Sequence, residues 1–254
     1  ERMVANWNTF DIGRDAAVRF NQPNAQAAAL NRISSQDPTQ ILGSLSANGR
    51  VFLVNPAGII FGRSATVDVG GLVASSLEML DSDFMAGSCR FSASGTAGSI
   101  LNQGNIKADG GVIALIAPRV TNEGTITANG GSVLLAAGGQ ASIDFDGDGL
   151  ITYTVAQGTI DALADNRGII KADGGLVVMT AKSADAIAAA VVNNSGVIEA
   201  RTLENKSGRI LLLSDMASGT AAVSGTLDAS APDGGDGGFI ETSAAQLNIA
   251  DGVS

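Results

Sequence analysis

The sequence of 254 residues contains no histidine and a single cysteine, Cys89. Without histidine the chain cannot build a serine or cysteine hydrolase triad or a histidine-based zinc site, and it lacks the commonest general base. A lone cysteine excludes an internal disulfide and the paired-cysteine motifs of redox and metal sites. These absences argue against catalysis, and we expect no metal ion and no cofactor.

Basic side chains are also scarce, with 15 lysines and arginines against 25 aspartates and glutamates, so the formal net charge is −10. A general nucleic-acid binder needs clustered basic residues to neutralise phosphates. No stretch approaches the roughly 18 consecutive apolar residues that indicate a membrane span. We therefore expect neither a nucleic-acid partner nor a membrane-spanning segment.

Glycine is abundant, with 33 residues, whereas aromatic residues make up only 4% of the chain. Apolar residues account for 45% and charged residues for 16%, which is enough to bury a substantial core and excludes disorder as the main state. A core with so few aromatic side chains must be built from small and β-branched ones. This composition favours repetitive β structure.

A repeated pattern dominates the middle of the chain. Residues 102–117 read Asn-x-Gly-x-Ile-x-Ala-x-Gly-Gly-x-Ile-x-Leu-x-Ala, and residues 122–137 repeat this frame with a valine in place of one isoleucine. The frame returns from Asn166 and from Asn194, and a fifth copy begins at Gly225. Apolar residues alternate at every second position, which indicates half-buried strands. The glycine pairs indicate corners, because glycine tolerates positive φ.

The equal offsets in successive copies predict the fold. Stacked coils would place like residues on like in parallel, in-register sheets around one elongated core. The chain is therefore predicted to be all-β, a single right-handed parallel β-helix. Two buried columns are expected, one of Ile106, Ile126 and Ile170 and the other of Leu115, Leu135 and Met179. The alternative, an antiparallel sandwich with coincidental glycines, explains five copies of one frame less well.

An insertion separates the second and third copies. Two alternating runs flank the acidic sequence Asp-Gly-Asp-Gly at 146–149, and we predict an extra-helical β-hairpin near residues 141–155 that projects from the coils. From Asp144 the loop resembles the front half of a calcium-binding EF-hand, but Val155 stands at the twelfth position, where calcium coordination needs glutamate. A solvated turn is favoured over weak calcium binding.

The first third of the chain carries a more specific set of motifs. In order, these are Asn6-Trp7-x-x-Phe10, Gln22-Pro23, Leu30-Asn31-Arg32 and Val51-Phe52-Leu53-Val54-Asn55-Pro56-x-Gly58. In this combination the chain resembles the two-partner-secretion (TPS) domain of filamentous-haemagglutinin-type exoproteins. The family's usual Asn-Pro-Asn-Gly has Ala57 at its third position here, which removes one side-chain acceptor from the turn.

This resemblance implies one β-helix domain over residues 1–254. Residues 1–80 would form the TPS signature region with N-terminal capping strands, and residues 81–254 would continue the coils. Trp7 and Phe10 are expected to plug the open end of the core, because terminal strands of a solenoid otherwise expose a pairing edge.

The resemblance also implies a function. The chain would be the N-terminal secretion domain of a large bacterial exoprotein, interpreted as an adhesin, that has lost its leader and crosses the periplasm. An outer-membrane TpsB-type β-barrel transporter would read it through periplasmic modules, and the domain would then nucleate β-helix folding outside. The protein would be secreted or held at the bacterial cell surface. The candidate site residues are Asn55, Pro56 and Gly58 of the turn, with Asn31 and Arg32 as recognition or turn-bracing residues, and no catalytic or metal-binding residue is assigned.

Two alternatives belong to other functional classes. The domain itself could bind a carbohydrate or a host receptor on its flat faces, although sugar sites commonly expose aromatic residues and the chain has one Trp and one Tyr. A β-helix polysaccharide-degrading enzyme would need carboxylates at matching offsets on adjacent coils. Asp161, Asp165, Asp173, Glu199 and Glu241 show no such arrangement in the sequence, and we expect the chain not to be an enzyme.

Overall fold

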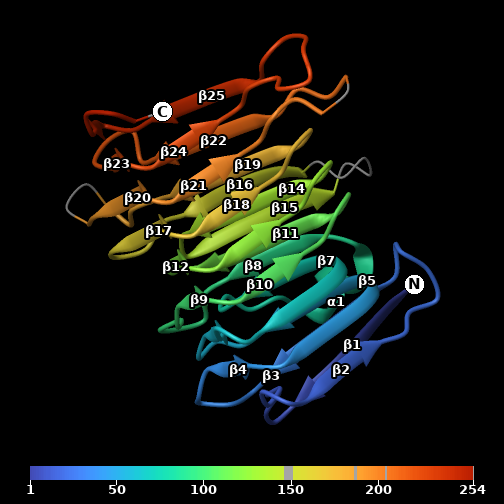
Figure 1. Ribbon diagram of the computed structural model, residues 1–254. Coiled ribbons are helices and arrows are strands. Elements are labelled where there is room, and N and C mark those ends of the chain that lie inside the picture. The colour runs from blue at the N-terminus through green and yellow to red at the C-terminus, as the bar shows by residue number, and fades with distance from the viewer. Residues whose placement is uncertain (146–150, 186–187, 204, 254) are drawn as a thin grey trace.

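The computed structural model describes residues 1–145, 151–185, 188–203 and 205–253. Its strands stack in parallel from β1 (Arg2–Trp7) at the N-terminal end to β25 (Phe239–Ser243) at the other (Figure 1). Among the described residues there is one short helix, α1 (Asp81–Ala86), and none with the length and hydropathy that a membrane crossing requires. The predicted all-β solenoid is confirmed.

Each coil has straight segments on three faces. The first face holds short strands: β2 (Ala17–Phe20), the first halves of β5 (Ser44–Val54) and β7 (Thr66–Ser75), β10 (Asn105–Lys107), β13 (Thr125–Thr127), β18 (Ile169–Lys171), β21 (Val197–Glu199) and β24 (Thr226–Asp228). The second face holds longer ones: β1, β3 (Ala28–Ile33), the second halves of β5 and β7, β11 (Val112–Ala117), β14 (Ser132–Ala137), β19 (Leu176–Ala181), β22 (Arg209–Ser214) and β25. The third face holds β4 (Thr39–Ile41), β6 (Ile59–Phe61), β9 (Ile100–Asn102), β12 (Arg119–Asn122), β17 (Ala162–Asn166), β20 (Ala190–Asn194), β23 (Thr220–Val223) and β26 (Gln246–Ile249).

The two predicted columns of like residues are confirmed. In-register pairing aligns Ile106, Ile126 and Ile170 on the first face, and Leu115, Leu135 and Met179 on the second. All six side chains are buried. Because alternate residues of every strand point inward, these columns join one continuous core along the solenoid.

Glycine serves the corners in two different ways. Gly130 has a φ of 68°, in the left-handed region that favours glycine. Its neighbour Gly131 has no positive φ, but a Cβ atom there would collide with the carbonyl oxygen of Gly111 one coil earlier. Positive φ therefore explains the first glycine of the pair, and the close approach of stacked coils explains the second.

A ladder of asparagines lines one corner inside the solenoid. The Nδ2 atom of Asn102 donates to Oδ1 of Asn122 at 2.7 Å, Asn122 donates to Asn166 at 2.8 Å, and Asn166 donates to Asn194 at 2.7 Å. All four side chains are fully buried. Each rung thus satisfies a buried amide with the equivalent amide of the next coil.

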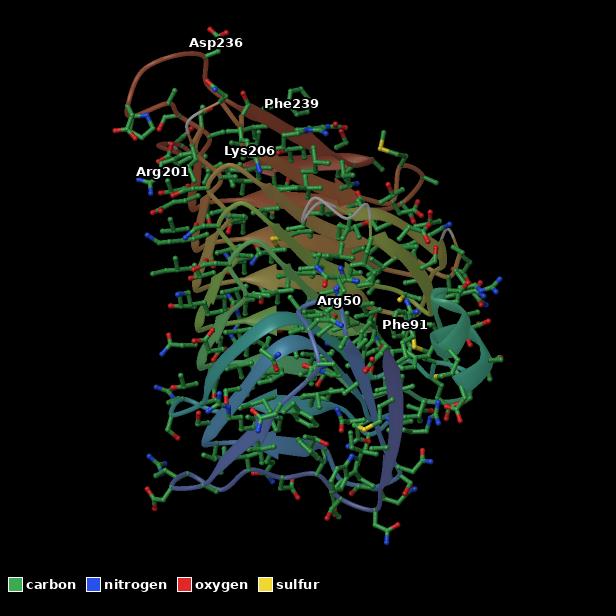
Figure 2. The ribbon with its side chains drawn as sticks, turned by 90° about the vertical axis from the view of Figure 1, so that its right-hand side faces the viewer. Arg50, Phe91, Arg201, Lys206, Asp236 and Phe239 are labelled. Atoms are coloured by element: carbon green, nitrogen blue, oxygen red, sulfur yellow. The ribbon has the colours of Figure 1, made fainter. Side chains whose placement is uncertain are left out.

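A second apolar core lies outside the solenoid, on the second face. Strands β8 (Cys89–Ser92), β15 (Gln140–Phe145) and β16 (Ile151–Gln157) form an antiparallel sheet in the order β16-β15-β8. This outer sheet and Phe84 of α1 pack on the outward side chains of the second face. Figure 2 shows Phe91 of β8 on the side of the stack that carries α1.

The predicted hairpin is therefore confirmed, but its predicted projection from the coils is wrong. Ala141 and Ile143 of the hairpin are buried against outward-facing residues such as Ala114 and Leu134. Strands β11, β14 and β19 are buried at every position as a result. Near-continuous apolar runs such as Val112–Ala117 are typical of strands covered on both sides.

The two ends of the solenoid differ. Phe10 is buried in the main core at the N-terminal end, where its ring meets Trp7 edge-on at 5.3 Å and stacks on Phe20 at 6.5 Å. Phe10 thus plugs the core as predicted, while Trp7 covers it from outside and stays 39% exposed. At the C-terminal end Ile240 and Leu247 are 43% and 50% exposed, because no described strand stacks on β25 or β26.

Candidate functional site

The turn from Asn55 to Gly58 connects β5 of the second face to β6 of the third face. The N–H of Gly58 donates to the carbonyl oxygen of Asn55 at 2.9 Å, and the N–H of Ala57 donates to Oδ1 of Asn55 at 3.0 Å. Gly58 has a φ of 113°, and a Cβ atom there would lie 2.6 Å from the carbonyl oxygen of Ser99. A side chain at position 58 would therefore strain the backbone and also collide with the next coil.

The Asn55 side chain is fully buried and joins the turn to the preceding coil. Its Nδ2 atom donates to the carbonyl oxygen of Asp37 at 3.1 Å and to Oγ1 of Thr39 at 3.0 Å. The carbonyl oxygen of Pro56 accepts from the N–H of Gly98 in the following coil at 2.7 Å. The turn thus links three successive coils through hydrogen bonds.

Asn31 of β3 is also fully buried. Its Oδ1 atom accepts from Nε1 of Trp7 at 3.0 Å, and its Nδ2 atom donates to the carbonyl oxygen of Phe52 at 3.2 Å. The side chain therefore joins β1, β3 and β5. In the folded domain this amide braces the first coils and presents no atom at the surface.

Arg32 lies next to Asn31 in sequence but points to the opposite side of the strand, where it is partly exposed. Its Nη2 atom donates to the carbonyl oxygen of Met79 at 2.6 Å, and its Nη1 atom lies 2.6 Å from the carboxylate of Asp81. Nη1 also donates to Oδ1 of Asn6 at 3.3 Å. Arg32 thus ties the N-terminal strand to the segment that begins α1.

Two of the candidate residues, Arg32 and Pro56, line one cleft of about 460 Å³. Arg32, Pro56, Ala57 and Glu78 line this cleft, and the buried amides of Asn31 and Asn55 do not. The sequence prediction therefore grouped residues that the fold brings together, but it did not separate lining residues from buried ones. It also missed Trp7 and Thr39 as their hydrogen-bonding partners, which no local motif indicates.

A charged cluster on adjacent coils was not predicted from the sequence. Arg201, at the edge of the stack in Figure 2, lies 2.6 Å from Asp173 and 3.4 Å from Glu199. Lys171 lies 2.9 Å from Glu199. Two carboxylates from neighbouring coils therefore meet, but a guanidinium group bridges them.

The protonation of Asp173 does not match that of the acid in a glycosidase pair. Burial of the Asp173 carboxyl opposes its ionisation, but hydrogen bonds from the side chain and backbone of Arg201 and the charges of Arg201 and Lys171 outweigh burial and lower its pKa. A glycosidase needs one carboxyl group whose pKa is raised so that it stays protonated. The cluster therefore acts as an ion-pair network between coils.

The acidic loop considered for calcium falls mostly outside the described residues, because Asp146 and Asp148 belong to the segment 146–150. In the part of the chain that the structure does describe, no group of three or more cysteine, aspartate or glutamate side chains is placed to hold a metal ion.

Comparison with known proteins identifies the family that the chain resembles. A protein-family model described as the TPS secretion domain matches residues 1–227. The crystal structure of the HMW1 secretion domain from Haemophilus influenzae matches with a TM-score of 0.70 and 27% sequence identity, over 99% of this chain and 90% of that chain.

Two curated proteins of Haemophilus influenzae, both named heme/hemopexin-binding protein, are similar in sequence. One is 34% identical over 217 residues, which cover 83% of this chain and 24% of the relative. The other is 32% identical over 237 residues, which cover 85% of this chain and 25% of the relative. The chain thus spans about a quarter of the length of the curated relatives it matches.

Proposed function

The chain belongs to the TPS secretion domain family, and on this premise we propose that it directs the export of a longer exoprotein through a dedicated outer-membrane TpsB-type β-barrel transporter. The match of the family model to residues 1–227 carries the proposal. The likeness to the HMW1 secretion domain over nearly the whole chain supports it further. The exoprotein passes through the periplasm and is released or held at the cell surface.

The transporter reads the chain before the solenoid forms. A coil with three faces is far wider than an extended strand, so a narrow pore admits the unfolded chain only. The burial of Asn31 and Asn55 supports this order, because neither amide is accessible to a partner after folding. An extended segment with alternating apolar residues can add as a strand to a sheet edge in the periplasmic modules.

The signature residues act in the first step of folding outside the cell. Asn55, Pro56 and Gly58 fix the turn that links successive coils, while Asn31 and Arg32 brace the strands that cap them. Once formed, these coils prevent the chain from sliding back and template the coils that follow.

The activity of the exoprotein is a separate proposal, and it is not enzymatic. The favoured activity is adhesion of the filamentous-haemagglutinin type, with a host receptor or polysaccharide as the ligand and a role in virulence. The names of the two relatives favour a competing activity, the capture of heme or hemopexin. Binding of the complete exoprotein to hemopexin, heme and a glycan panel distinguishes the two.

The test of export is secretion of the chain, behind a leader, from cells with and without the barrel partner. Secretion that does not depend on the partner would refute the proposal. Asn55→Ala and Gly58→Val should each reduce secretion several-fold, because the first removes hydrogen bonds of the turn and the second strains the turn and collides with the next coil. Asn105→Ala and Gly95→Val are matched controls, since Asn105 is exposed and Gly95 has open space around it.

Unfolding of the purified variants separates folding from recognition. We expect Asn55→Ala and Gly58→Val to lower both the stability and the secreted amount. A variant that is secreted poorly but folds with unchanged stability would instead assign position 55 or 58 to recognition by the transporter.

A further inference from the structure

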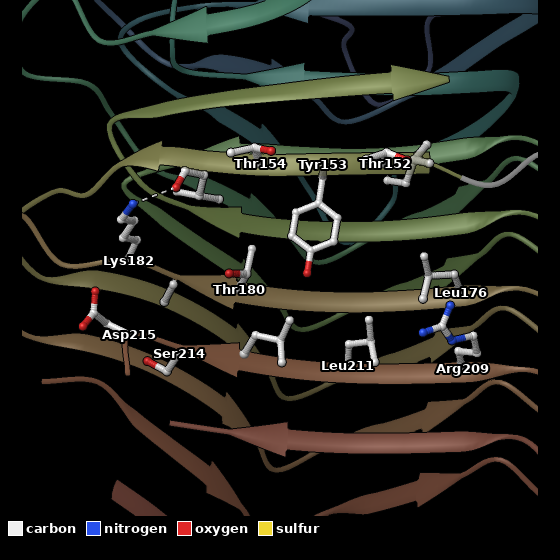
Figure 3. A pocket seen from close by; sticks show the side chains of 14 residues that line it. Thr152, Tyr153, Thr154, Leu176, Thr180, Lys182, Arg209, Leu211, Ser214 and Asp215 are labelled. Carbon is white, nitrogen blue, oxygen red and sulfur yellow. Dashed lines mark hydrogen bonds between the residues drawn. The ribbon is translucent and has the colours of Figure 1, made fainter. Parts of the chain in front are cut away.

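A groove of about 550 Å³ lies on the second face, beside the free edge of the outer sheet (Figure 3). One wall is β16, and the floor is formed by the outward side chains of β19 and β22. The outer sheet covers the second face up to β19, and the groove begins where this cover ends.

Among the described strands, β16 pairs only with β15 and is the last strand of its sheet. The carbonyl oxygen of Val155 faces the groove, where Nζ of Lys182 binds it at 3.2 Å. Lys182 also binds the carbonyl oxygen of Ala156 at 2.9 Å. Since residues two apart on an antiparallel strand direct their backbone groups to the same side, Tyr153 and Ile151 also face the groove.

The floor of the groove continues the apolar layer of the outer sheet. Leu176 and Leu211 are nearly buried, and Leu213 is half-buried. Figure 3 shows Leu176 and Leu211 directed into the groove beside Tyr153. A strand added about 4.8 Å from β16 would lie over this floor and cover these side chains.

Arg209 supplies a positive charge at one end of the groove, and the carboxylate of Glu241 also acts on the Tyr153 side chain. Arg209 lies at the end next to Leu176, and it has a ring contact with Phe239 at 5.8 Å but no ion pair with any described residue. The other end holds both Lys182 and Asp215, whose carboxylate accepts from backbone N–H groups of the loop that follows β22. A ligand with an acidic group at the Arg209 end would match this charge pattern.

We propose that this groove binds one extended polypeptide segment of a partner protein as a fourth strand of the outer sheet, with alternate apolar side chains on the floor and an acidic residue at the Arg209 end. The segment continues the β15–β16 pairing through backbone hydrogen bonds to Ile151, Tyr153 and Val155. In the absence of the segment, Lys182 occupies the carbonyl oxygen of Val155 and so prevents unwanted pairing, as lysines commonly do on edge strands. The proposal concerns the folded domain and is independent of the export function.

A second folded copy does not fit this groove. In this domain β16 lies directly above the second face, so its free edge opens into the space over β19 and β22 that the groove occupies. A strand already built into another solenoid would bring its own coils into that space. An isolated extended segment has no such obstacle.

The probe is a dye-labelled synthetic peptide with the sequence of β15, Gln140–Phe145. Its apolar residues alternate, and antiparallel docking along β16 places its aspartate at the Arg209 end, as Asp144 faces Thr152 in the domain. Fluorescence anisotropy with the 254-residue chain should show saturable binding. Methylation of alternate peptide nitrogens should weaken binding at least about tenfold, because it removes the backbone hydrogen bonds.

Variants of the chain locate the site. Arg209→Glu should weaken binding several-fold, and a peptide with lysine in place of its aspartate should restore it. Leu213→Lys should abolish binding, whereas Ile160→Lys, at an exposed position outside the groove, should not. Lys182→Ala should tighten binding, because the carbonyl oxygen of Val155 is then free to bind the peptide.

Absence of saturable binding at about 1 mM peptide, or equal binding of the methylated peptide, would overturn the proposal. Binding that survives Leu213→Lys would overturn it as well. Capture of a glycan that is lost on Tyr153→Ala would assign the groove to a carbohydrate instead.

Discussion

The indole Nε1 atom of Trp7 donates a hydrogen bond of 3.0 Å to Oδ1 of Asn31, and this bond closes the N-terminal end of the solenoid from within. Asn31 simultaneously donates to the carbonyl oxygen of Phe52. One buried amide therefore holds the first strand, its neighbour and the strand of the next coil together. The role of Asn31 in a folded TPS domain follows from this position.

Replacing Asn31 by alanine should destabilise the domain by about 1–3 kcal/mol, because the indole N–H of Trp7 and the buried carbonyl oxygen of Phe52 would each lose a partner. Urea unfolding followed by fluorescence measures this, and Trp7 is the only tryptophan of the chain. Asn6→Ala is the control, since Asn6 is exposed and bonds to Arg32 at the surface. Equal stability of the two variants would contradict the bracing role.

Leu135→Asp should prevent stable folding. Leu135 is fully buried between Leu115 and Met179, and the change would place an unpaired carboxylate in the core at a cost above about 4 kcal/mol. Circular dichroism and thermal unfolding measure the loss. Thr127→Asp on an outward position of the first face should fold normally, and a folded Leu135→Asp domain would show that the register is wrong.

The asparagine ladder predicts non-additive effects. Asn122→Ala should cost about 1–3 kcal/mol, because Asn102 loses its acceptor and Asn166 loses its donor. A second change, Asn166→Ala, should cost less in that background than in the parent chain, because one of its bonds is already gone. Denaturant unfolding of the two single variants and the double variant gives the coupling energy, and strict additivity would contradict the ladder.

Cys89 reports on the outer sheet. Burial raises the pKa of its thiol to about 11, although the charges of Arg2 and Arg50 oppose the shift. A raised pKa favours the neutral thiol in the fold, so this contribution to stability is complete below the ordinary value of about 8.5 and declines as pH rises towards 11.

Two measurements follow from this thiol. Ellman's reagent should react slowly with the native chain at pH 8 and rapidly in denaturant, because the thiolate is the reactive form. Stability should fall between pH 9 and about 11 in the parent chain but less so in Cys89→Ala. Rapid labelling of the native chain would mean that β8 does not stay packed on the second face.

Calcium should not stabilise the domain. The acidic loop after Asp144 has Val155 where calcium coordination needs a bidentate glutamate. Thermal unfolding in excess chelator and in millimolar calcium should therefore nearly coincide. A calcium-dependent rise in the midpoint that disappears in Asp146→Asn or Asp148→Asn would contradict this.

The main core was predictable because its signal is local and repeated. Ile106, Ile126 and Ile170 occupy equal offsets from their glycine corners, and parallel in-register pairing follows from that regularity alone. The outer sheet was not predictable in the same way. Outward residues such as Ala114 and Leu134 are apolar, but the repeat does not indicate which segment covers them. Strand β8, which helps to cover them, belongs to no repeat in the sequence.

The candidate site shows the same division. The turn at Asn55 and Gly58 could be predicted, because asparagine, proline and glycine have fixed turn preferences. The burial of Asn31 could not, because it depends on Trp7 reaching across 24 positions of sequence. Arg32 was proposed as a recognition or turn-bracing residue, but its bond to Met79 depends on the path of a segment outside the motif.

In the asparagine ladder, the number of residues between two rungs does not determine the distance between them in space. Asn102 and Asn122 are 20 residues apart and Asn122 and Asn166 are 44 residues apart, yet the rungs measure 2.7 Å and 2.8 Å. The β15–β16 hairpin accounts for most of the difference, because it leaves the solenoid at a corner between the second and third faces. Such corners are sites where new segments can be grafted during evolution or by engineering, and the scaffold retains its rise per coil whatever it carries.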